Sequence, residues 1–249
     1  MQKINFFFDF LSPYSYFAWK NHSNQLDRGL FEYRPILMGK LFAHWDIKGP
    51  GEIAPKRYTM LKSCFRYAKK NNIDFIPPIE HPFNPLYVLR LATYECAKEQ
   101  QFEVIDCLWD MIWARGEKAD EPQVIETTLK NAGLEHELLM ERSFSKEAKI
   151  AVKQNTKEAV AKGLFGVPSF VVDNEFFWGN DSLSDLKDTL LHAAIDLLIS
   201  GTESGTTAGT YTIKNYSSSA TNYTLVSSTA VFANTIANTS AYSSGGIPE

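Results

Sequence analysis

Residues 4–15 read INFFFDFLSPYS, an apolar run that leads directly into a Ser-Pro pair. The aromatic and β-branched residues at its start favour a strand. Ser12 followed by Pro13 favours the start of a helix, because serine is a common N-cap and proline a common first helical residue. Free backbone N–H groups and the helix dipole attract an anion to such a helix start. We therefore expect an anion-binding site at Ser12, although a plain N-cap, worth about 1 kcal/mol of stability, also explains this residue.

The composition of the 249-residue chain sets broad limits on its class. With 44% hydrophobic residues, the chain can bury the core of one or two domains. Its net charge of −4 gives no general reason to bind nucleic acid or an anionic membrane. The first residues lack the pattern of a secretory signal, and no apolar run approaches the roughly 20 residues that span a bilayer. We expect a cytoplasmic protein that binds neither nucleic acid nor membrane.

Cysteine and histidine usage indicates neither disulfide nor metal chemistry. Cys64, Cys96 and Cys107 fall inside helical patterns and share no C-x-x-C or metal-type spacing. Because a free cysteine often serves as a small core residue, we expect buried or half-buried structural thiols. The five histidines form neither an H-E-x-x-H motif nor an i, i+4 pair, so we expect no dedicated metal site.

The next part of the chain changes from a strand pattern to helical patterns. Residues 31–37 read FEYRPIL and favour a second strand, in which Pro35 indicates an edge strand or a strand end. Residues 38–54 hold glycines and Pro50, and we interpret them as an irregular connection. Helical spacing and caps then predict helices in the segments 55–68, 84–91, 104–112, 121–133, 138–139 and 145–163.

Beyond residue 163 the pattern returns to strands. Residues 169–172 and 175–178, on either side of Asp173-Asn174, predict a β-hairpin. A last helix carries four leucines on one face: Leu183, Leu186, Leu190 and Leu197. The order β-α-β, a helical block and then β-β-α is better explained by one sheet than by two domains. We therefore predict an α/β fold with a large all-helical insertion at about residues 38–160.

The composition changes abruptly at Gly201. Ser, Thr, Asn, Ala and Gly make up most of residues 201–249, and charged residues are rare there. The segments 211–213 and 223–226 have β-propensity, but the stretch lacks the apolar residues for a core of its own. We predict a domain over residues 1–200 and a low-complexity tail that is weakly structured or paired as a hairpin.

Five motifs now stand in order along the chain: FDFLSPYSY (8–16), GPGEIAPKR (49–57), HPFNPL (81–86), GVPSFVV (166–172) and FWGND (177–181). Together these motifs resemble the 2-hydroxychromene-2-carboxylate isomerase family, close kin of the kappa-class glutathione transferases. The resemblance spans residues 3–198 and none of the tail. It implies a thioredoxin-like domain with a helical insertion, glutathione as the cofactor, and a homodimer.

The resemblance also implies roles for five residues. The serine of the Ser-Pro-Tyr motif, here Ser12, hydrogen-bonds the sulfur of glutathione. The residue before the cis-proline pairs its backbone with the cysteinyl part, a role that falls on Val167 before Pro168. The turn after the hairpin holds the γ-glutamyl end, which falls on Asp181 and Ser182. On spacing alone, Pro168 is also explained as an edge-strand proline, and the last two as helix caps.

Two departures from the family pattern bear on this site. Relatives commonly carry an arginine after the aspartate, where this chain has Ser182, so a bidentate cationic clamp for a carboxylate is lost. Kappa-type members are expected to have an asparagine in the region 47–50, which reads IKGP here. Redox proteins of the thioredoxin type carry a C-x-x-C motif where this chain has residues 12–15, SPYS, and this disfavours a thiol–disulfide oxidoreductase.

The chemistry expected at Ser12 is the stabilisation of a thiolate. A thiol with a pKa near 8.5 is only about 3% ionised at pH 7, and a pKa lowered by about two units makes it mostly ionised. A helix N-terminus and a hydroxyl donor stabilise the anion and not the thiol, and therefore supply that shift. Ser12 is then a donor to sulfur rather than a nucleophile, since no Ser-His-Asp pattern supports the latter role.

Three functions follow, in order of preference. The first is a glutathione-dependent isomerase of an aromatic enone-acid; the second is a kappa-class-like glutathione transferase or peroxidase, which consumes glutathione on an electrophilic substrate. The third is a non-catalytic thioredoxin-fold binding module in which the tail is the functional part. Aromatic residues that could line an acceptor pocket, although such residues more often belong to the core, are Tyr14, Phe42, Trp45 and Trp178.

Overall fold

The computed structural model describes residues 3–173, 175–191, 197–198, 211–213 and 223–225. Contacts between Cα atoms divide the chain into two compact units, Met1–Leu186 and Lys187–Glu249. All of the predicted site residues belong to the first unit.

The first unit is built on a sheet with the strand order β2-β1-β3-β4. The central strand β1 (Ile4–Phe8) pairs in parallel with β2 (Phe31–Pro35) and antiparallel with β3 (Ser169–Val172), and β3 pairs antiparallel with β4 (Glu175–Trp178). β2 is an edge strand that ends at Pro35, as the proline predicted. Because Phe7 lies opposite Ser169, the C-terminal end of β1 and the N-terminal end of β3 lie side by side.

The continuous apolar run at the start of the chain is explained by burial of β1 on both faces. Phe6 and Phe8 face α1 (Pro13–Gln25), and their ring centres lie 6.2 and 6.4 Å from that of Trp19. Phe7 points the other way, into an apolar cluster that includes Leu41 and Ala159. Successive side chains of a strand alternate between its faces, so a strand covered by helices on both sides is apolar at every position.

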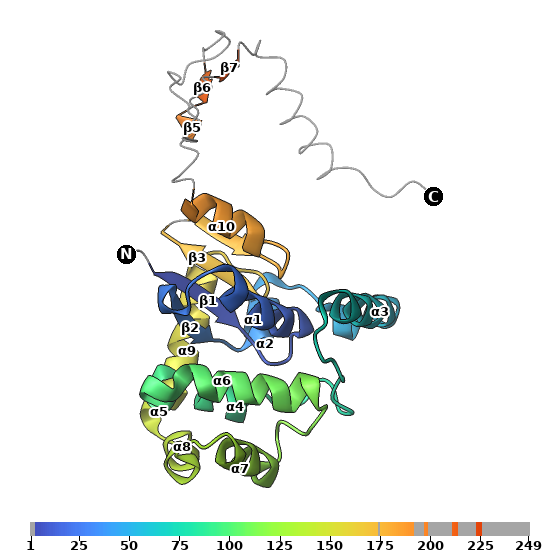
Figure 1. Cartoon of the computed structure of the whole chain (residues 1–249), viewed down its shortest axis with the longest axis vertical. Helices are drawn as coiled ribbons and strands as arrows, with labels where there is room; N and C mark the ends of the chain where they lie inside the picture. Colours follow the sequence, from blue (N-terminus) through green and yellow to red (C-terminus); the bar gives the residue numbers. More distant parts are fainter. Residues whose placement is uncertain (1–2, 174, 192–196, 199–210, 214–222, 226–249) are drawn as a thin grey trace. The chain divides into compact units, whose positions relative to one another are not determined.

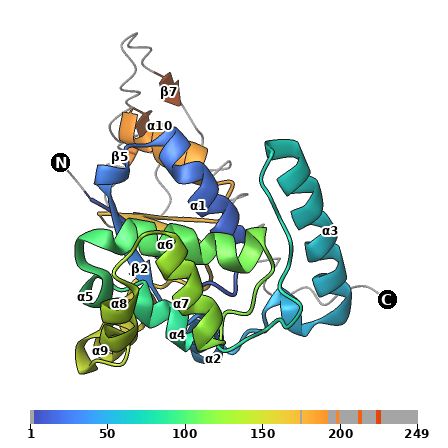
Figure 2. The ribbon, with the colours of Figure 1, turned by 60° about the horizontal axis from the view of Figure 1, so that its bottom comes forward.

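The helical insertion occupies the chain between β2 and β3. Its α-helices are α2 (Met38–Trp45), α3 (Ala54–Asn71), α4 (Leu86–Leu91), α5 (Tyr94–Ala97), α6 (Gln101–Trp109), α7 (Pro122–Asn131), α8 (His136–Arg142) and α9 (Lys146–Ala161). A π-helical segment, Asp110–Ala114, continues α6. Helices α4 to α8 gather in one group, and α3 stands apart from them in both views (Figure 1 and Figure 2). The predicted α/β fold with a large helical insertion is confirmed.

Local signals account for several helix boundaries. The Ser145 hydroxyl accepts a hydrogen bond from the Ala148 N–H at 3.1 Å and so caps α9 as predicted. Gly163, with φ of 76°, follows the end of the same helix, where a left-handed residue is common. The Asn84 side chain accepts from the Leu86 N–H at 3.1 Å before α4.

Two boundary predictions are wrong. Residues 38–54 contain the helix α2, which starts where the Asp9 carboxylate accepts the Met38 N–H at 2.8 Å. This tertiary contact across 29 positions outweighs the weak local helix preference of a segment that contains a glycine. The last helix, α10 (Leu183–Leu191), ends before Leu197, whose backbone pairs with Ile213 instead of continuing the helix.

In the second unit, three short strands form an antiparallel sheet in the order β5-β6-β7. They are β5 (Leu197–Leu198), β6 (Tyr211–Ile213) and β7 (Tyr223–Leu225). The two segments with β-propensity thus pair with each other. The rest of the tail lies outside the described residues, as does Asn174 of the predicted hairpin turn. No helix in the described part of the chain has the length and apolarity needed to cross a membrane.

Candidate functional site

Ser12 lies at the end of the short loop that joins β1 to α1. It is the N-cap of α1: its backbone is extended, and its Oγ accepts a hydrogen bond from the Ser15 N–H at 3.2 Å. Pro13 is the first helical residue, as the Ser-Pro pair predicted. Ser12 is only 5% exposed. The positive end of the α1 dipole is therefore directed at a hydroxyl that is nearly enclosed by protein.

The hydroxyl of Ser12 also connects α1 to a residue that is distant in the sequence. It donates a hydrogen bond to the carbonyl oxygen of Val167 at 3.3 Å. The peptide bond between Val167 and Pro168 is cis, and β3 begins at the next residue, Ser169. No described group accepts a hydrogen bond from the Val167 N–H. Two of the predicted site residues, Ser12 and Val167, are thus in direct contact, and the Val167 N–H beside them is available to a ligand.

Side chains from distant parts of the sequence hold the loop that carries Ser12. The Trp113 Nε1–H donates to the Phe10 carbonyl at 2.8 Å. The His81 Nε2 lies 2.9 Å from the Leu11 carbonyl oxygen, and it must carry the proton there because a carbonyl oxygen only accepts. The rings of His81 and Trp113 lie against each other, with centres 5.6 Å apart. The loop is therefore fixed by the helical insertion, one residue before Ser12.

Asp9 also holds the loop that carries Ser12. Its carboxylate accepts hydrogen bonds from the Leu11 N–H at 3.0 Å and the Met38 N–H at 2.8 Å, and its carbonyl accepts from the Ser12 N–H at 3.0 Å. The residue is fully buried. Burial raises the pKa of Asp9 to about 7, and the two N–H donors offset only part of that effect. A carboxylate that ties the loop to α2 therefore titrates near neutral pH.

Our sequence reasoning assigned no role to Asp9, His81 or Trp113. His81 belongs to the HPFNPL motif, so the motif marked its position without showing its contact. An acid inside an apolar run was a signal for Asp9, since a buried carboxylate needs hydrogen-bond donors. Trp113 sits among other core aromatics, and its sequence context carries no comparable signal.

Asp181 and Ser182 lie in the turn between β4 and α10. The Ser182 hydroxyl donates to the Gly179 carbonyl at 2.8 Å, and Gly179 has a left-handed φ of 104°. Asp181 is exposed. Burial, then the neighbouring Cys64 thiol, and then the charge of Asp181 raise the pKa of Tyr14. The charge of Asp181 thus acts on Tyr14, in the first turn of α1.

The four candidate aromatic residues do not share one environment. Trp45 and Trp178 are 42% and 53% exposed, so neither belongs to the core. The Trp178 indole lies against the backbone of Gly166, where an added Cβ would come within 2.8 Å of Nε1. Trp178 therefore stands beside the Gly166-Val167-Pro168 segment. Phe42 instead lies against Gly49, and Tyr14 is half-buried next to Cys64.

The cysteines have the environments expected of structural thiols. Cys64 and Cys96 are buried and Cys107 is half-buried. Burial raises the pKa of each thiol to about 12, so all three remain protonated at neutral pH. None stands in the SPYS segment. The described residues include no group of three His, Cys, Asp or Glu side chains that could hold a metal ion.

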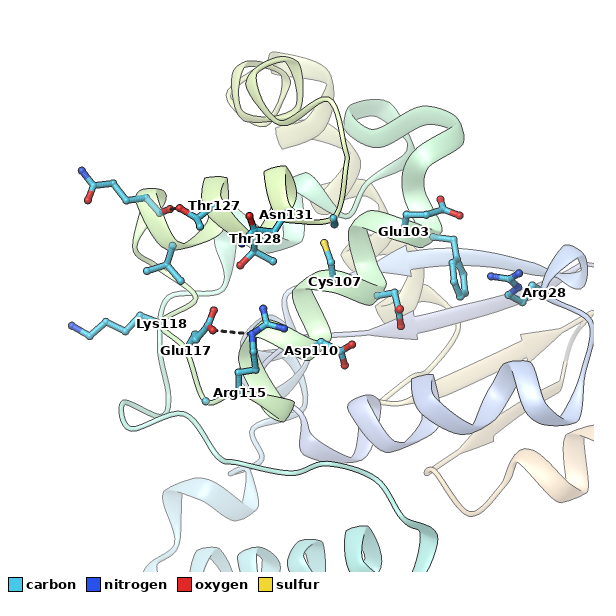
Figure 3. A pocket seen from close by; sticks show the side chains of 16 residues that line it. Arg28, Glu103, Cys107, Asp110, Arg115, Glu117, Lys118, Thr127, Thr128 and Asn131 are labelled. Carbon is cyan, nitrogen blue, oxygen red and sulfur yellow. Dashed lines mark hydrogen bonds and ion pairs between the residues drawn. The ribbon is translucent and has the colours of Figure 1, made fainter.

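A hollow of about 970 Å³ lies elsewhere, between α6 and α7, and none of the predicted site residues lines it. Figure 3 shows Cys107 pointing from α6 into this hollow, toward the side of α7 that carries Thr128. Among its charged groups, Arg115 pairs with Glu117 at 2.8 Å and Asp110 pairs with Lys20 at 2.7 Å. Burial keeps the Cys107 thiol protonated at neutral pH, so this thiol is not an activated nucleophile, and Ser12 remains the candidate site.

Curated proteins of known activity match most of the chain. A 2-hydroxychromene-2-carboxylate isomerase of Sphingobium xenophagum is 28% identical over 192 residues, which cover 76% of this chain and 97% of that protein. Glutathione S-transferase kappa 1 of Caenorhabditis elegans is 25% identical over 212 residues, which cover 76% and 91%. The resemblance inferred from the motifs is confirmed.

Solved structures agree on the fold. A 2-hydroxychromene-2-carboxylate isomerase structure superimposes with a TM-score of 0.68 at 23% identity, covering 75% of this chain and 93% of that one. The cytosolic disulfide reductase DsbM of Pseudomonas aeruginosa gives a TM-score of 0.52 at 14% identity, covering 76% and 98%. The model of the DSBA-like thioredoxin domain matches residues 3–191. The chain therefore belongs to the family of DSBA-like thioredoxin domains.

Proposed function

We propose that the protein is a glutathione-dependent isomerase of an aromatic enone-acid of the 2-hydroxychromene-2-carboxylate type. Its relatives named as isomerases and kappa glutathione transferases support an enzyme of this kind. The observation that carries the proposal is the Ser12 hydroxyl at the α1 N-terminus, 3.3 Å from the Val167 carbonyl, in a segment, SPYS, that has no cysteine of its own. A thiolate brought from outside the chain suits this donor set.

The residues at the α1 N-terminus fit the thiol of glutathione. A thiolate has no proton to donate and needs donors. The Ser12 hydroxyl supplies one and the Tyr14 N–H a second, because Pro13 has no N–H and the N–H groups of Ser15 and Tyr16 bond to Ser12. The chemistry that glutathione supplies when bound is a thiolate that adds reversibly to a conjugated double bond, which allows rotation about that bond before the thiol leaves. The task of Ser12 is to hold that sulfur as the anion.

Backbone and turn residues would bind the rest of the tripeptide. The Val167 N–H and carbonyl offer one donor and one acceptor to an extended peptide, as an unpaired strand edge does. Asp181 would accept from the γ-glutamyl ammonium, and Ser182 would donate to its carboxylate. The Ser182 hydroxyl is now used on Gly179 and has to turn for this role. Since a hydroxyl replaces the arginine of relatives, we expect weaker binding of that end.

Trp178 is the aromatic residue best placed to meet an aromatic substrate. It is half-exposed and lies against Gly166, directly before the residue that would bind the cysteinyl part of glutathione. A flat indole face at that place favours stacking of an aromatic ring. The names of the isomerase relatives suggest the substrate class, and the position of Trp178 supports it.

A glutathione transferase or peroxidase is the second candidate, because kappa transferases of Caenorhabditis elegans match the same part of the chain. The consumption of glutathione during turnover distinguishes an isomerase from a transferase or peroxidase. With glutathione far below the substrate concentration, an isomerase completes the reaction and leaves the thiol unchanged, whereas a transferase or peroxidase stops when glutathione is exhausted. Absence of both reactions with glutathione binding intact would favour the third candidate, a binding module.

The remaining expectations complete the proposal. We expect a homodimer in the cytoplasm that acts on a small electrophilic molecule and binds neither nucleic acid nor membrane. Light scattering of the purified chain tests the dimer directly, with twice the 28.2 kDa mass of the chain as the expected result and a single-chain mass as the contrary one.

A further inference from the structure

Ser15, the fourth residue of the SPYS segment, has an unusual environment. It is fully buried, and its hydroxyl has no hydrogen-bond partner among the described residues. Its backbone N–H, by contrast, donates to the Ser12 Oγ at 3.2 Å. A buried hydroxyl without a partner destabilises the fold, and alanine at the same position would avoid that penalty. The presence of serine here calls for a role outside the unliganded fold.

The position of Ser15 on α1 directs its side chain to the N-terminal end of the helix. Ser12 is the N-cap and Ser15 the third helical residue, and in a capping box the side chain at this third position turns back toward the N-cap residue. The usual alternative acceptor for a helical serine hydroxyl is the carbonyl four residues earlier, that of Leu11. That carbonyl is engaged by His81 Nε2 at 2.9 Å. The Ser15 hydroxyl does not bond to it. Because the Ser15 N–H already reaches the Ser12 Oγ at 3.2 Å, that oxygen is an acceptor close to the Ser15 side chain.

The hydrogen-bond capacity of Ser12 leaves room for such a donor. A serine hydroxyl donates one hydrogen bond and accepts two. The Ser12 hydroxyl now donates to Val167 and accepts from the Ser15 N–H, so one acceptor position remains. When the Ser12 proton turns from the Val167 carbonyl toward a thiolate, the oxygen becomes a better acceptor, because hydrogen bonds in a chain polarise one another.

We infer that Ser15 is a positioning residue whose hydroxyl donates to the Ser12 Oγ when a thiolate is bound, and so strengthens the hydrogen bond from Ser12 to sulfur. The inference rests on the proposed function and deepens it. Ser15 does not touch the sulfur; it acts through Ser12. It also gives the unpartnered buried hydroxyl a partner in the state that performs the chemistry.

The experiment measures the ultraviolet absorbance of the thiolate of bound glutathione across pH, together with thermal stability without ligand, in wild type, Ser12→Ala and Ser15→Ala. We expect Ser15→Ala to raise the pKa of the bound thiol, with an acid dissociation constant about threefold to tenfold smaller, as loss of one ordinary hydrogen bond does. We expect its unliganded stability to equal or exceed that of wild type, because the variant removes a hydroxyl without a partner.

Ser143→Ala is the matched control. Ser143 is also fully buried, but its hydroxyl donates to the Met140 carbonyl at 2.7 Å, far from Ser12 in sequence. This variant should lose stability and leave the pKa of the bound thiol unchanged.

Each contrary result has a definite meaning. If Ser15→Ala unfolds or loses stability while the pKa of the bound thiol stays the same, Ser15 is an ordinary structural serine and the inference is wrong. If the thiolate signal disappears in Ser12→Ala and is unchanged in Ser15→Ala, the proposed function survives and the role of Ser15 does not. If wild type gives no thiolate signal with saturating glutathione, the proposed function itself fails, and the inference with it.

Discussion

The Ser12 hydroxyl donates a hydrogen bond to the Val167 carbonyl oxygen at 3.3 Å, across 155 positions of the sequence. This contact joins the first turn of α1 to the residue before the cis-proline at the start of β3. A hydroxyl has one proton, so Ser12 cannot serve Val167 and a thiolate at once. Binding of a thiolate must therefore release the Val167 carbonyl, which becomes free to accept from the peptide part of the same ligand.

Asp9 should make stability depend on pH in a direction unusual for an acid. Its pKa is raised to about 7, so the folded state holds a proton that the unfolded state loses at lower pH. This contribution is fully present below about pH 4 and is lost as the pH rises to about 7. Asp9→Asn should remove this component, as denaturant unfolding from pH 4 to 8 would reveal.

The control for this series is Asp173→Asn, which changes an exposed aspartate with φ of 52° to a residue that tolerates the same backbone. It should keep the wild-type pH dependence. An identical pH dependence in Asp9→Asn and wild type would contradict the assignment of the proton to Asp9.

Trp113→Phe tests the support of the loop that carries Ser12. The change keeps a ring near Phe75, with which Trp113 stacks at 5.6 Å, but leaves the Phe10 carbonyl without its donor. A buried acceptor left unpaired costs about 1–3 kcal/mol, so the urea midpoint should fall accordingly. Trp178→Phe, at a residue that is 53% exposed, should change it little. Equal effects of the two substitutions would show that the Trp113 hydrogen bond does not hold the loop.

Gly179→Ala tests whether the turn before α10 orients the proposed ligand-binding residues Asp181 and Ser182. Gly179 has φ of 104°, and an added Cβ would collide with the Asp181 carboxylate. We expect a loss of about 1–2 kcal/mol from backbone strain together with weaker glutathione binding in calorimetry. Gly133→Ala has comparable strain, with φ of 74° and open space around it, and should lose stability but keep its affinity. Unchanged affinity in Gly179→Ala would remove this turn from the site.

Ser182→Arg should introduce the cation that the family resemblance leads us to expect after the aspartate. A guanidinium can hold a carboxylate with two hydrogen bonds, so affinity for glutathione should rise by about threefold to tenfold at this half-exposed position. Calorimetry with cysteinylglycine, which lacks the γ-glutamyl group, provides the comparison and should show no gain. An equal gain for both ligands would mean that the arginine acts only as a general positive charge.

The sequence was sufficient for the main features of the fold because those features have local causes. The apolar run 4–8, the Ser-Pro pair and the hairpin at 169–178 each predict an element without help from the rest of the chain, and all were confirmed. The start of α2 could not be predicted in this way, because its cap is a carboxylate 29 positions away. Leu197 fits a helical repeat as well as a strand, and only pairing with Ile213 decides between them.

The sequence predicted candidate site residues but not the side chains that hold the loop that carries Ser12. The N-cap position of Ser12 follows from cap chemistry and is confirmed. The roles of Val167, Pro168, Asp181 and Ser182 came from the resemblance to a family, and all five residues remain predictions as ligand-binding residues. The contacts of His81 with Leu11 and of Trp113 with Phe10 join segments 70 and 103 positions apart. No periodicity or spacing encodes such contacts, since they arise from the way the helical insertion packs on the sheet.

The most direct test of a glutathione thiolate held by Ser12 is thermal stability with glutathione and with S-methylglutathione, in wild type and in Ser12→Ala. At about 100 times its Kd, a ligand adds about 2.7 kcal/mol of stability. We expect both ligands to stabilise the wild type, glutathione more strongly than its methylated form, and Ser12→Ala to lose that difference while still responding to both. A wild type that responds to neither ligand, or a preference for the free thiol that survives in Ser12→Ala, would contradict the account.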